Sequence, residues 1–316
     1  MSHPYSYYSK RTLDPIIWVT FMRSINLILS FCDFLFDSIF GLSFLHGSKE
    51  ERTEATNCYE KSAHVLKIVA RGTINLACHH DESNFIYVHD SFTHPKYILE
   101  NKNVYLKTIT KEKVIFFVSD KDVNAYDAKH GPFSFGNIFI NAKYLIVLPI
   151  DSFNRLAEEA GDPIAKHGAK ITIIHMTARC GSTLLGTIIM MLCGYHLDLD
   201  KIVMKSILQY NLECVLLSGQ CLDKIPKTRV ISEPFSFVNL NALYVKGHIS
   251  FVEYKRLLES TFRLQCKIEK DADIDHIIMK WNPYGTASIP YLKVNLIKAL
   301  VIIFQLLNCN FLRVFI

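Results

Sequence analysis

This chain of 316 residues lacks the paired cysteines of disulfide-stapled domains and of many zinc sites. Its nine cysteines are scattered, none belongs to a Cys-x-x-Cys pair, and their number is odd. These features argue against a disulfide framework. Several of the cysteines lie inside apolar runs, where a free thiol packs as a small hydrophobic side chain in a reducing compartment. This favours a cytoplasmic protein, with membrane association as the alternative.

A convincing set of metal ligands is also missing. The run Ala77-Cys78-His79-His80 contains ligand-type side chains, but no second pair of ligands accompanies it. Because structural zinc sites use four protein ligands, we expect a polar turn here and no bound metal.

The chain has no strong excess of charge of one sign and no low-complexity tract or internal repeat. Its formal net charge is +5, and its lysines and arginines are spread along the sequence. Such a balance suits an anionic small ligand and argues against a nucleic-acid partner. Since half of the residues are hydrophobic, extended disorder is not expected.

No uncharged apolar run reaches the roughly 20 residues that a bilayer-spanning helix needs. Residues 15–45 are rich in Phe, Ile and Leu, but Arg23, Asp33 and Asp37 interrupt them. They predict an interfacial or buried helix, and they do not follow the pattern of a signal peptide. Residues 299–312 are also apolar but short. Membrane contact through the two apolar termini therefore stays open.

The region that follows the first apolar segment has a mixed α and β pattern. Ser48 and the acidic residues after it predict a helix over 48–71. Short β-rich runs then predict an antiparallel or mixed sheet, with strands at 85–88, 104–109, 114–118 and 138–148. A short helix is expected over 151–159, and 164–169 are expected to form a linker.

The second half alternates strands and helices. Strands are predicted at 170–175, 229–232 and 276–280, with helices at 182–193, near 199–217, and at 251–266. This alternation predicts a parallel sheet that binds ligands at the carboxyl ends of its strands. The predicted fold class is α/β, with a P-loop-type parallel sheet flanked by helices and preceded by a smaller mixed α+β region. The predicted domains are 1–47, 48–168 and 169–316.

The most informative motif lies at 171–186, where a β-branched strand breaks into a polar turn and resumes as an apolar helix. This is the outline of a phosphate-binding loop, in which free backbone N–H groups at a helix start face an anion. A nucleoside-triphosphate loop needs a Lys before Ser182, and that Lys is absent. The place of its first glycine is taken by His175 or Met176.

Other chemistries fit the same loop poorly. A cysteine phosphatase uses Cys-x5-Arg, but the sixth residue after Cys180 is Gly186. The glycine pair of a nucleophile elbow is absent around Ser182.

The run Thr-Ala-Arg-Cys-Gly-Ser-Thr-Leu-Leu resembles the 5′-phosphosulfate loop of sulfotransferases that use 3′-phosphoadenosine 5′-phosphosulfate (PAPS), in particular the uncharacterised sulfotransferase-like P-loop proteins of invertebrates. Arg179 takes the family's basic place, Cys180 the small one and Gly181 the tight turn. Ser182 and Thr183 take the places of the hydroxyls. Ser232-Glu233-Pro234, further along, adds to the resemblance.

The resemblance implies transfer of a sulfuryl group from PAPS to a hydroxyl or amine of a small-molecule or carbohydrate acceptor, with no metal. It implies that Arg179 binds the donor and stabilises the leaving group, and that Glu233 is the general base. The donor-binding residues implied are Ala178, Arg179, Cys180, Gly181, Ser182, Thr183 and Arg313. The plainer alternatives are a surface ion pair for Arg179, helix capping for Ser182 and Thr183, and a solvated turn for Glu233.

The resemblance stops at the 3′-phosphate site. The family grips that phosphate with an Arg after a strand and a Ser on the following helix. Arg313 follows an apolar run, but no Ser-bearing helix comes after it, so we expect an incomplete domain. A nucleotide kinase or NTPase, and an inactive interaction or membrane-associated protein, remain as alternatives. His276 and Lys280 flank a predicted strand, and Lys280 could reach an anion from its end. His175 is expected to be a polar residue of its strand without a catalytic role.

Overall fold

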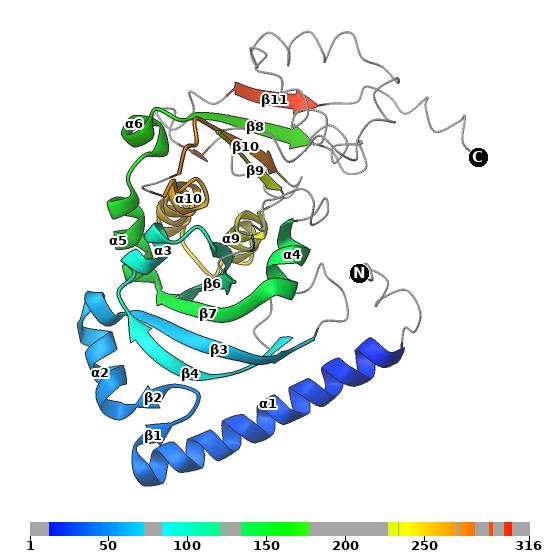
Figure 1. Ribbon diagram of the computed structural model, residues 1–316, viewed down its shortest axis with the longest axis vertical. Helices are drawn as coiled ribbons and strands as arrows, with labels where there is room; N and C mark the ends of the chain where they lie inside the picture. Colours follow the sequence, from blue (N-terminus) through cyan, green and yellow to red (C-terminus); the bar gives the residue numbers. More distant parts are fainter. Residues whose placement is uncertain are drawn as a thin grey trace. The chain divides into compact units, whose positions relative to one another are not determined.

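The structure, a computed structural model, contains one antiparallel and one parallel sheet of four or more strands (Figure 1). It describes residues 13–72, 84–120, 123, 134–176, 227–232, 234–269, 272–281, 291–292 and 300–304. The chain divides into two compact units, residues 1–123 with 138–156 and residues 124–137 with 157–316. It is mixed α/β, as predicted.

The first unit is built on a five-stranded antiparallel sheet with the strand order β4-β3-β7-β6-β5. Its strands are β3 (Ala63–Arg71), β4 (Phe85–Thr93), β5 (Val104–Ile109), β6 (Lys113–Ser119) and β7 (Ala142–Pro149). The same unit holds α1 (Leu13–Phe40), β1 (Leu42–Ser43), β2 (Gly47–Ser48), α2 (Lys49–Asn57), the 3-10 helix η2 (Tyr59–Lys61) and α3 (Lys96–Glu100). The division between the units falls within α4 (Ser134–Asn141) and α5 (Ile150–Ala160).

Aromatic side chains form the core of this first unit. Phe85 on β4 lies 5.3 Å from Phe117 and 5.2 Å from Phe139, measured between ring centroids. Phe153, at the start of α5, packs against Phe116 on β6 at 6.3 Å. All five of these rings are almost fully buried. Burying such rings is the main favourable contribution to folding.

The single helix predicted over 48–71 is wrong in its second half. Ser48 does cap α2, in a capping box with Glu51. The helix ends because Cys58 has an extended backbone, and residues 63–71 form strand β3 instead. Residues 64–67 of this strand pair on both sides, with β4 and with β7. Sheet pairing thus outweighs the helical start signal.

Two neighbouring expectations also needed correction. The strand predicted at 138–148 begins only at Ala142, because residues 138–141 belong to α4. The linker predicted at 164–169 contains helix α6 (Pro163–His167), whose first turn is capped by the Asp162 carboxylate. The predicted strands around β4, β5 and β6 and the short helix within α5 are confirmed.

The second unit contains a four-stranded sheet in which every pairing is parallel, with the order β11-β8-β10-β9. Its strands are β8 (Lys170–Met176), β9 (Thr228–Ser232), β10 (His276–Trp281) and β11 (Leu300–Phe304), and its helices include α9 (Phe235–Val245) and α10 (Phe251–Gln265). The three predicted strands and the helix at 251–266 are confirmed. The helices predicted at 182–193 and near 199–217 lie outside the described residues.

Two features of this unit were missed in the sequence. Helix α9 is apolar around most of its circumference, so it shows no helical periodicity. Part of the apolar run at 299–312 forms β11, which pairs with β8. The described part of that run is therefore a strand of the sheet, because β-branched apolar residues suit a strand buried in a parallel sheet.

Helices α9 and α10 pack through aromatic rings. Phe237 on α9 lies 4.6 Å from Trp281 at the end of β10. Tyr254 on α10 stacks on Tyr244 at 4.7 Å and donates a hydrogen bond of 2.6 Å to the Asn241 Oδ1 atom. These contacts fix both helices and the end of β10 as one packed group.

Candidate functional site

The carboxyl edge of the parallel sheet is the place to which the predicted site residues are attached. Met176 is the last residue of β8 and pairs with Phe304 on β11. On the other side of β8, Trp281 ends β10 opposite His175. Ser232 ends β9 opposite Lys280. All four strands therefore finish at one edge, each within one residue of its neighbour.

The connections between the strands change direction at β8. From β8 the chain passes to β9, two places away on one side, and then back to the intervening β10. From β10 it crosses to β11 on the other side of β8. In parallel α/β sheets, a reversal of this kind marks the edge at which ligands bind.

The predicted loop residues follow directly after Met176, but they lie outside the described residues. This holds for Ala178, Arg179, Cys180, Gly181, Ser182 and Thr183, and also for Glu233 and Arg313. Glu233 comes directly after Ser232, the last residue of β9. The structure thus describes the strands that precede the loop and Glu233.

Three secondary candidates fall on described strands. Lys280 is the next-to-last residue of β10 and lies opposite Ile174, close to the carboxyl edge. His175 is the next-to-last residue of β8, between Trp281 on β10 and Ile303 on β11, and lies at the same carboxyl edge. His276 begins β10 at the opposite edge and is buried, which places it away from the end of β8.

A buried charge cluster, which the sequence did not reveal, lies toward the amino edge of the sheet. Arg229 on β9 donates to the Glu269 Oε2 atom at 2.5 Å, and the Lys267 Nζ atom lies 3.3 Å from Oε1. Burial alone would raise the pKa of Glu269, but the two neighbouring cations outweigh it and lower that pKa. Burial lowers the pKa of Lys267 to about 8. Because Arg229 also donates to the Lys267 carbonyl, the cluster joins β9 to the segment after α10.

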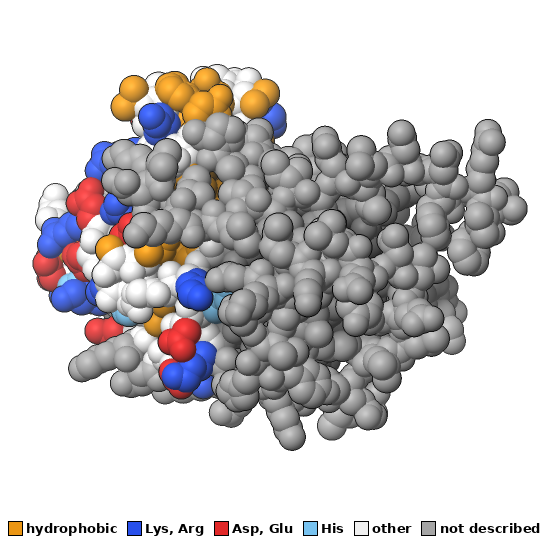
Figure 2. Space-filling model, turned by 90° about the horizontal axis from the view of Figure 1, so that it is seen from above, with side chains coloured by type: hydrophobic (Ala, Val, Ile, Leu, Met, Phe, Trp, Pro, Cys, Tyr) orange, Lys and Arg blue, Asp and Glu red, His pale blue; other side chains and the backbone are white. Residues whose placement is uncertain are grey.

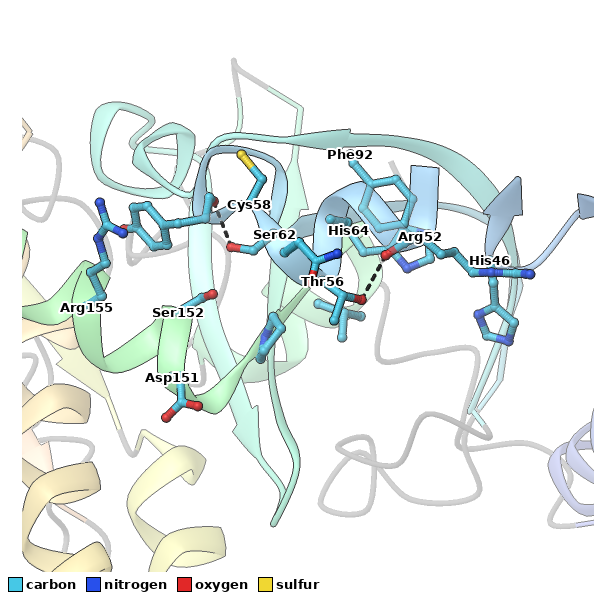
Figure 3. Close-up of a pocket in the computed structure, with 15 residues that line it drawn as sticks. His46, Arg52, Thr56, Cys58, Ser62, His64, Phe92, Asp151, Ser152 and Arg155 are labelled. Atoms are coloured by element: carbon cyan, nitrogen blue, oxygen red, sulfur yellow. Dashed lines mark hydrogen bonds between the residues drawn. The ribbon is translucent and has the colours of Figure 1, made fainter. Parts of the chain in front are cut away.

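The first unit contains an open pocket of about 670 Å³ (Figure 3). Fifteen residues line it, among them His46, Arg52, His64, Phe92 and Arg155. They come from the segment 46–64, which runs from the β1–β2 turn to β3, and from β4, β7 and α5, so the pocket joins segments that are far apart in the sequence. For this reason, a local sequence motif could not reveal the pocket.

The cations and histidines of this pocket are engaged by their neighbours. Arg52 donates to the Asp37 carboxylate at 2.6 Å, and the Arg155 guanidinium lies over the Tyr59 ring at 3.8 Å. The His64 Nε2 atom lies 2.9 Å from the Nδ1 atom of His89. Burial, with the His89 ring beside it, lowers the pKa of His64 to about 3. At neutral pH the His64 ring is therefore uncharged.

Among the described residues, no group of three or more His, Cys, Asp or Glu side chains is arranged to hold a metal ion. The Ala77-Cys78-His79-His80 run lies outside them. On the face presented in Figure 2, described Lys and Arg side chains lie interspersed with Asp and Glu side chains.

Comparison with protein-family models, with curated proteins and with solved structures found no match to this chain.

Proposed function

We propose that the second unit is a P-loop-type domain that binds PAPS and transfers its sulfuryl group to a hydroxyl or amine of a small-molecule or carbohydrate acceptor. PAPS is a co-substrate here. The proposal rests on the loop sequence and on its attachment to the sheet.

One observation carries the proposal. Strand β8 lies inside the parallel sheet, at the reversal of strand order, and its last residue directly precedes Thr177-Ala178-Arg179-Cys180-Gly181. A ligand at this edge would meet the start of the segment after β8. An anion is favoured there when that segment begins a helix, because free N–H groups and the helix dipole point at it.

The loop residues would each supply one part of the donor site. Arg179 would hold the 5′-phosphate with its planar set of donors and offset the charge that grows on the bridging oxygen. Gly181 would let the backbone approach the phosphate closely. Ser182 and Thr183 would add hydroxyl hydrogen bonds to those of the backbone.

In the transfer, the acceptor oxygen or nitrogen forms a bond to sulfur while the bond from sulfur to the 5′-phosphate oxygen breaks. Glu233 would take the acceptor proton, and the products would be the sulfated acceptor and adenosine 3′,5′-bisphosphate. Support comes from the strand order, since β9 lies two strand spacings, or about 10 Å, from β8. A group held between the two strand ends would be within reach of both side chains.

A thermal-shift titration tests donor binding. Adenosine 3′,5′-bisphosphate should raise the melting temperature of the full chain, because a ligand that binds only the folded state stabilises it. Mg-ATP should raise it less, since the loop lacks the Lys of a triphosphate site. Arg179→Ala should abolish the shift. Arg256→Ala should preserve it, because Arg256 is an exposed arginine on α10 of the same unit.

The other outcomes are informative. A larger shift with Mg-ATP than with the bisphosphate would favour a nucleotide kinase or NTPase. A folded protein that responds to neither would favour an inactive interaction protein. Comparing the bisphosphate with adenosine 5′-monophosphate, in wild type and in Arg313→Ala, tests whether Arg313 contributes to the 3′-phosphate site.

A further inference from the structure

Helix α1 is attached to the first unit through its polar residues. Asn26 donates to the Phe85 carbonyl at 2.9 Å, and Asp33 accepts from the Ser43 hydroxyl at 2.7 Å. Asp37 pairs with Arg52 at 2.6 Å. Near the start of the helix, the Trp18 indole N–H donates to the Arg71 carbonyl at 3.0 Å. These contacts extend along most of the helix, which lies beside β4 (Figure 1).

The opposite side of the helix is apolar and uncovered. Eleven large hydrophobic side chains between residues 17 and 40 are 43% to 76% exposed. They are Ile17, Trp18, Phe21, Leu27, Ile28, Phe31, Phe34, Leu35, Phe36, Ile39 and Phe40, and together they are called the α1 apolar face. Trp18 lies at the margin of this face, since its indole N–H also donates to the Arg71 carbonyl. Only Val19 and Met22 are buried apolar residues of this stretch, and the inward positions after them include Asn26, Asp33 and Asp37, so the helix presents most of its large apolar side chains outward.

The width of the α1 apolar face favours lipid over a single protein partner. At 100° per residue its members spread over about two thirds of the helix circumference. A partner helix would cover only the narrow stripe of a coiled-coil seam, and a second copy would leave many of these rings in water. A lipid phase can surround the whole arc. Arg23 is the only charged residue of α1 on the exposed side between residues 17 and 40, and its long stem can carry the charge to the headgroups.

The hydrogen bonds of the helix decide its orientation. By length and composition α1 could cross a bilayer, with a mean hydropathy of 1.5 over its apolar window. A spanning helix would have to give up the contacts of Asn26, Asp33 and Asp37 with the sheet and the β1–β2 hairpin. It would then place two carboxylates in hydrocarbon, which is costly. A helix that keeps these contacts can enter the membrane only side-on.

We propose that α1 docks the first unit on a lipid bilayer, lying in the plane of the membrane with its apolar face among the acyl chains. Because this face carries a single cation, binding needs no anionic lipid and depends little on salt. The surface belongs to the first unit and does not depend on the proposed donor site of the second.

Vesicle flotation of the full chain tests the docking. The protein should float with vesicles of pure phosphatidylcholine at both low and high salt. The Leu27→Ser/Ile39→Ser variant, which alters two of the most exposed members of the face, should bind at least tenfold more weakly. Val245→Ser/Val252→Ser removes equally exposed apolar side chains from α9 and α10 and should bind like wild type. Equal circular-dichroism melts would show that the variants fold.

Tryptophan quenching by brominated lipids tests the orientation. Trp18 is 45% exposed, whereas Trp281 is buried at 1%. Trp18, and a tryptophan placed mid-helix by Phe31→Trp in a Trp18→Phe background, should both be quenched at the same shallow depth. Deep quenching at position 31 alone would mean a spanning helix and overturn the proposal. So would failure to bind phosphatidylcholine, or a dimer in solution that Leu27→Ser/Ile39→Ser dissolves.

Discussion

At the scale of single residues, a buried charge cluster links β9 to the segment after α10 in the second unit. Its charged side chains are largely shielded from water, so water cannot take the place of a missing partner. Arg229 and Glu269 are each only about a tenth exposed at their side chains, and Lys267 is equally buried. Removing one partner of such a cluster leaves a buried charge without compensation.

Glu269→Gln should therefore lower the free energy of unfolding by about 3 kcal/mol. Urea denaturation followed by circular dichroism measures this change. Lys61→Ala, which breaks the exposed pair of Lys61 and Glu54 at 2.7 Å, is the matched control and should leave stability unchanged. If the two variants have the same stability, the cluster does not hold the fold.

His64 gives the first unit a dependence on pH. Its folded pKa of about 3 lies below the unfolded value of about 6.5, so the unfolded chain binds more protons at acidic pH. The stability from the neutral ring is complete above pH 6.5 and is lost as the pH falls toward 3.

His64→Gln should flatten the fall in stability between pH 6.5 and 4, by at most about 1.4 kcal/mol per pH unit. Urea denaturation at a series of pH values measures the slope. His248→Gln, at an exposed histidine, should keep the wild-type slope. An unchanged slope in His64→Gln would contradict the account of the histidine pair.

At the scale of elements, the helix start predicted at Ser48 is confirmed, and Ser250 begins α10 in the same way. Ser48 and Ser250 both cap a helix and both form a capping box with an acid three residues later. These signals are local, since the donor and acceptor lie within one turn of each other.

Ser250→Ala should lower the free energy of unfolding by about 1 kcal/mol, because it removes the acceptor for the Glu253 N–H group. Ser250→Asp should restore most of the loss, as aspartate is an equally good cap. Thermal or urea denaturation of the two variants distinguishes capping from a general effect of the substitution.

Helix ends and tertiary contacts were harder to predict. The strand at 63–71 forms because it pairs with β4 and β7. The helix start at Ser48 is a local signal and gave no indication of this pairing, so the helix was predicted to continue to residue 71. Helix α1 was expected to be interfacial or buried. Within the described residues of the first unit, most of its large apolar side chains are exposed, and this result depends on which side of the helix the sheet occupies.

For the site, the sequence predicted the strand at 170–175, which is confirmed as β8, because its β-branched run is a local signal; the loop and helix predicted after it lie outside the described residues. The sequence could not predict the cluster of Arg229, Lys267 and Glu269, or the pocket around His64. Their members are brought together only by the fold. Conversely, Arg179 and the other residues of the proposed chemistry lie outside the described residues. Their proposed roles are inferred from the sequence motif alone.

At the scale of the whole molecule, the chain combines two units with different sheets and different proposed partners. The antiparallel unit carries the α1 apolar face, and the parallel unit carries the sheet edge that directly precedes the proposed phosphate loop. Binding of a nucleotide and binding of lipid can therefore be tested separately, and the failure of one leaves the other standing.

The most direct test of the central claim is isothermal titration calorimetry of the full chain with adenosine 3′,5′-bisphosphate. Wild type and Arg256→Ala should bind with the same affinity, and Arg179→Ala should bind at least tenfold more weakly, a loss of about 1.4 kcal/mol or more. Absence of binding by a folded wild-type protein, or equal binding by Arg179→Ala, would contradict the assignment of this loop to the donor.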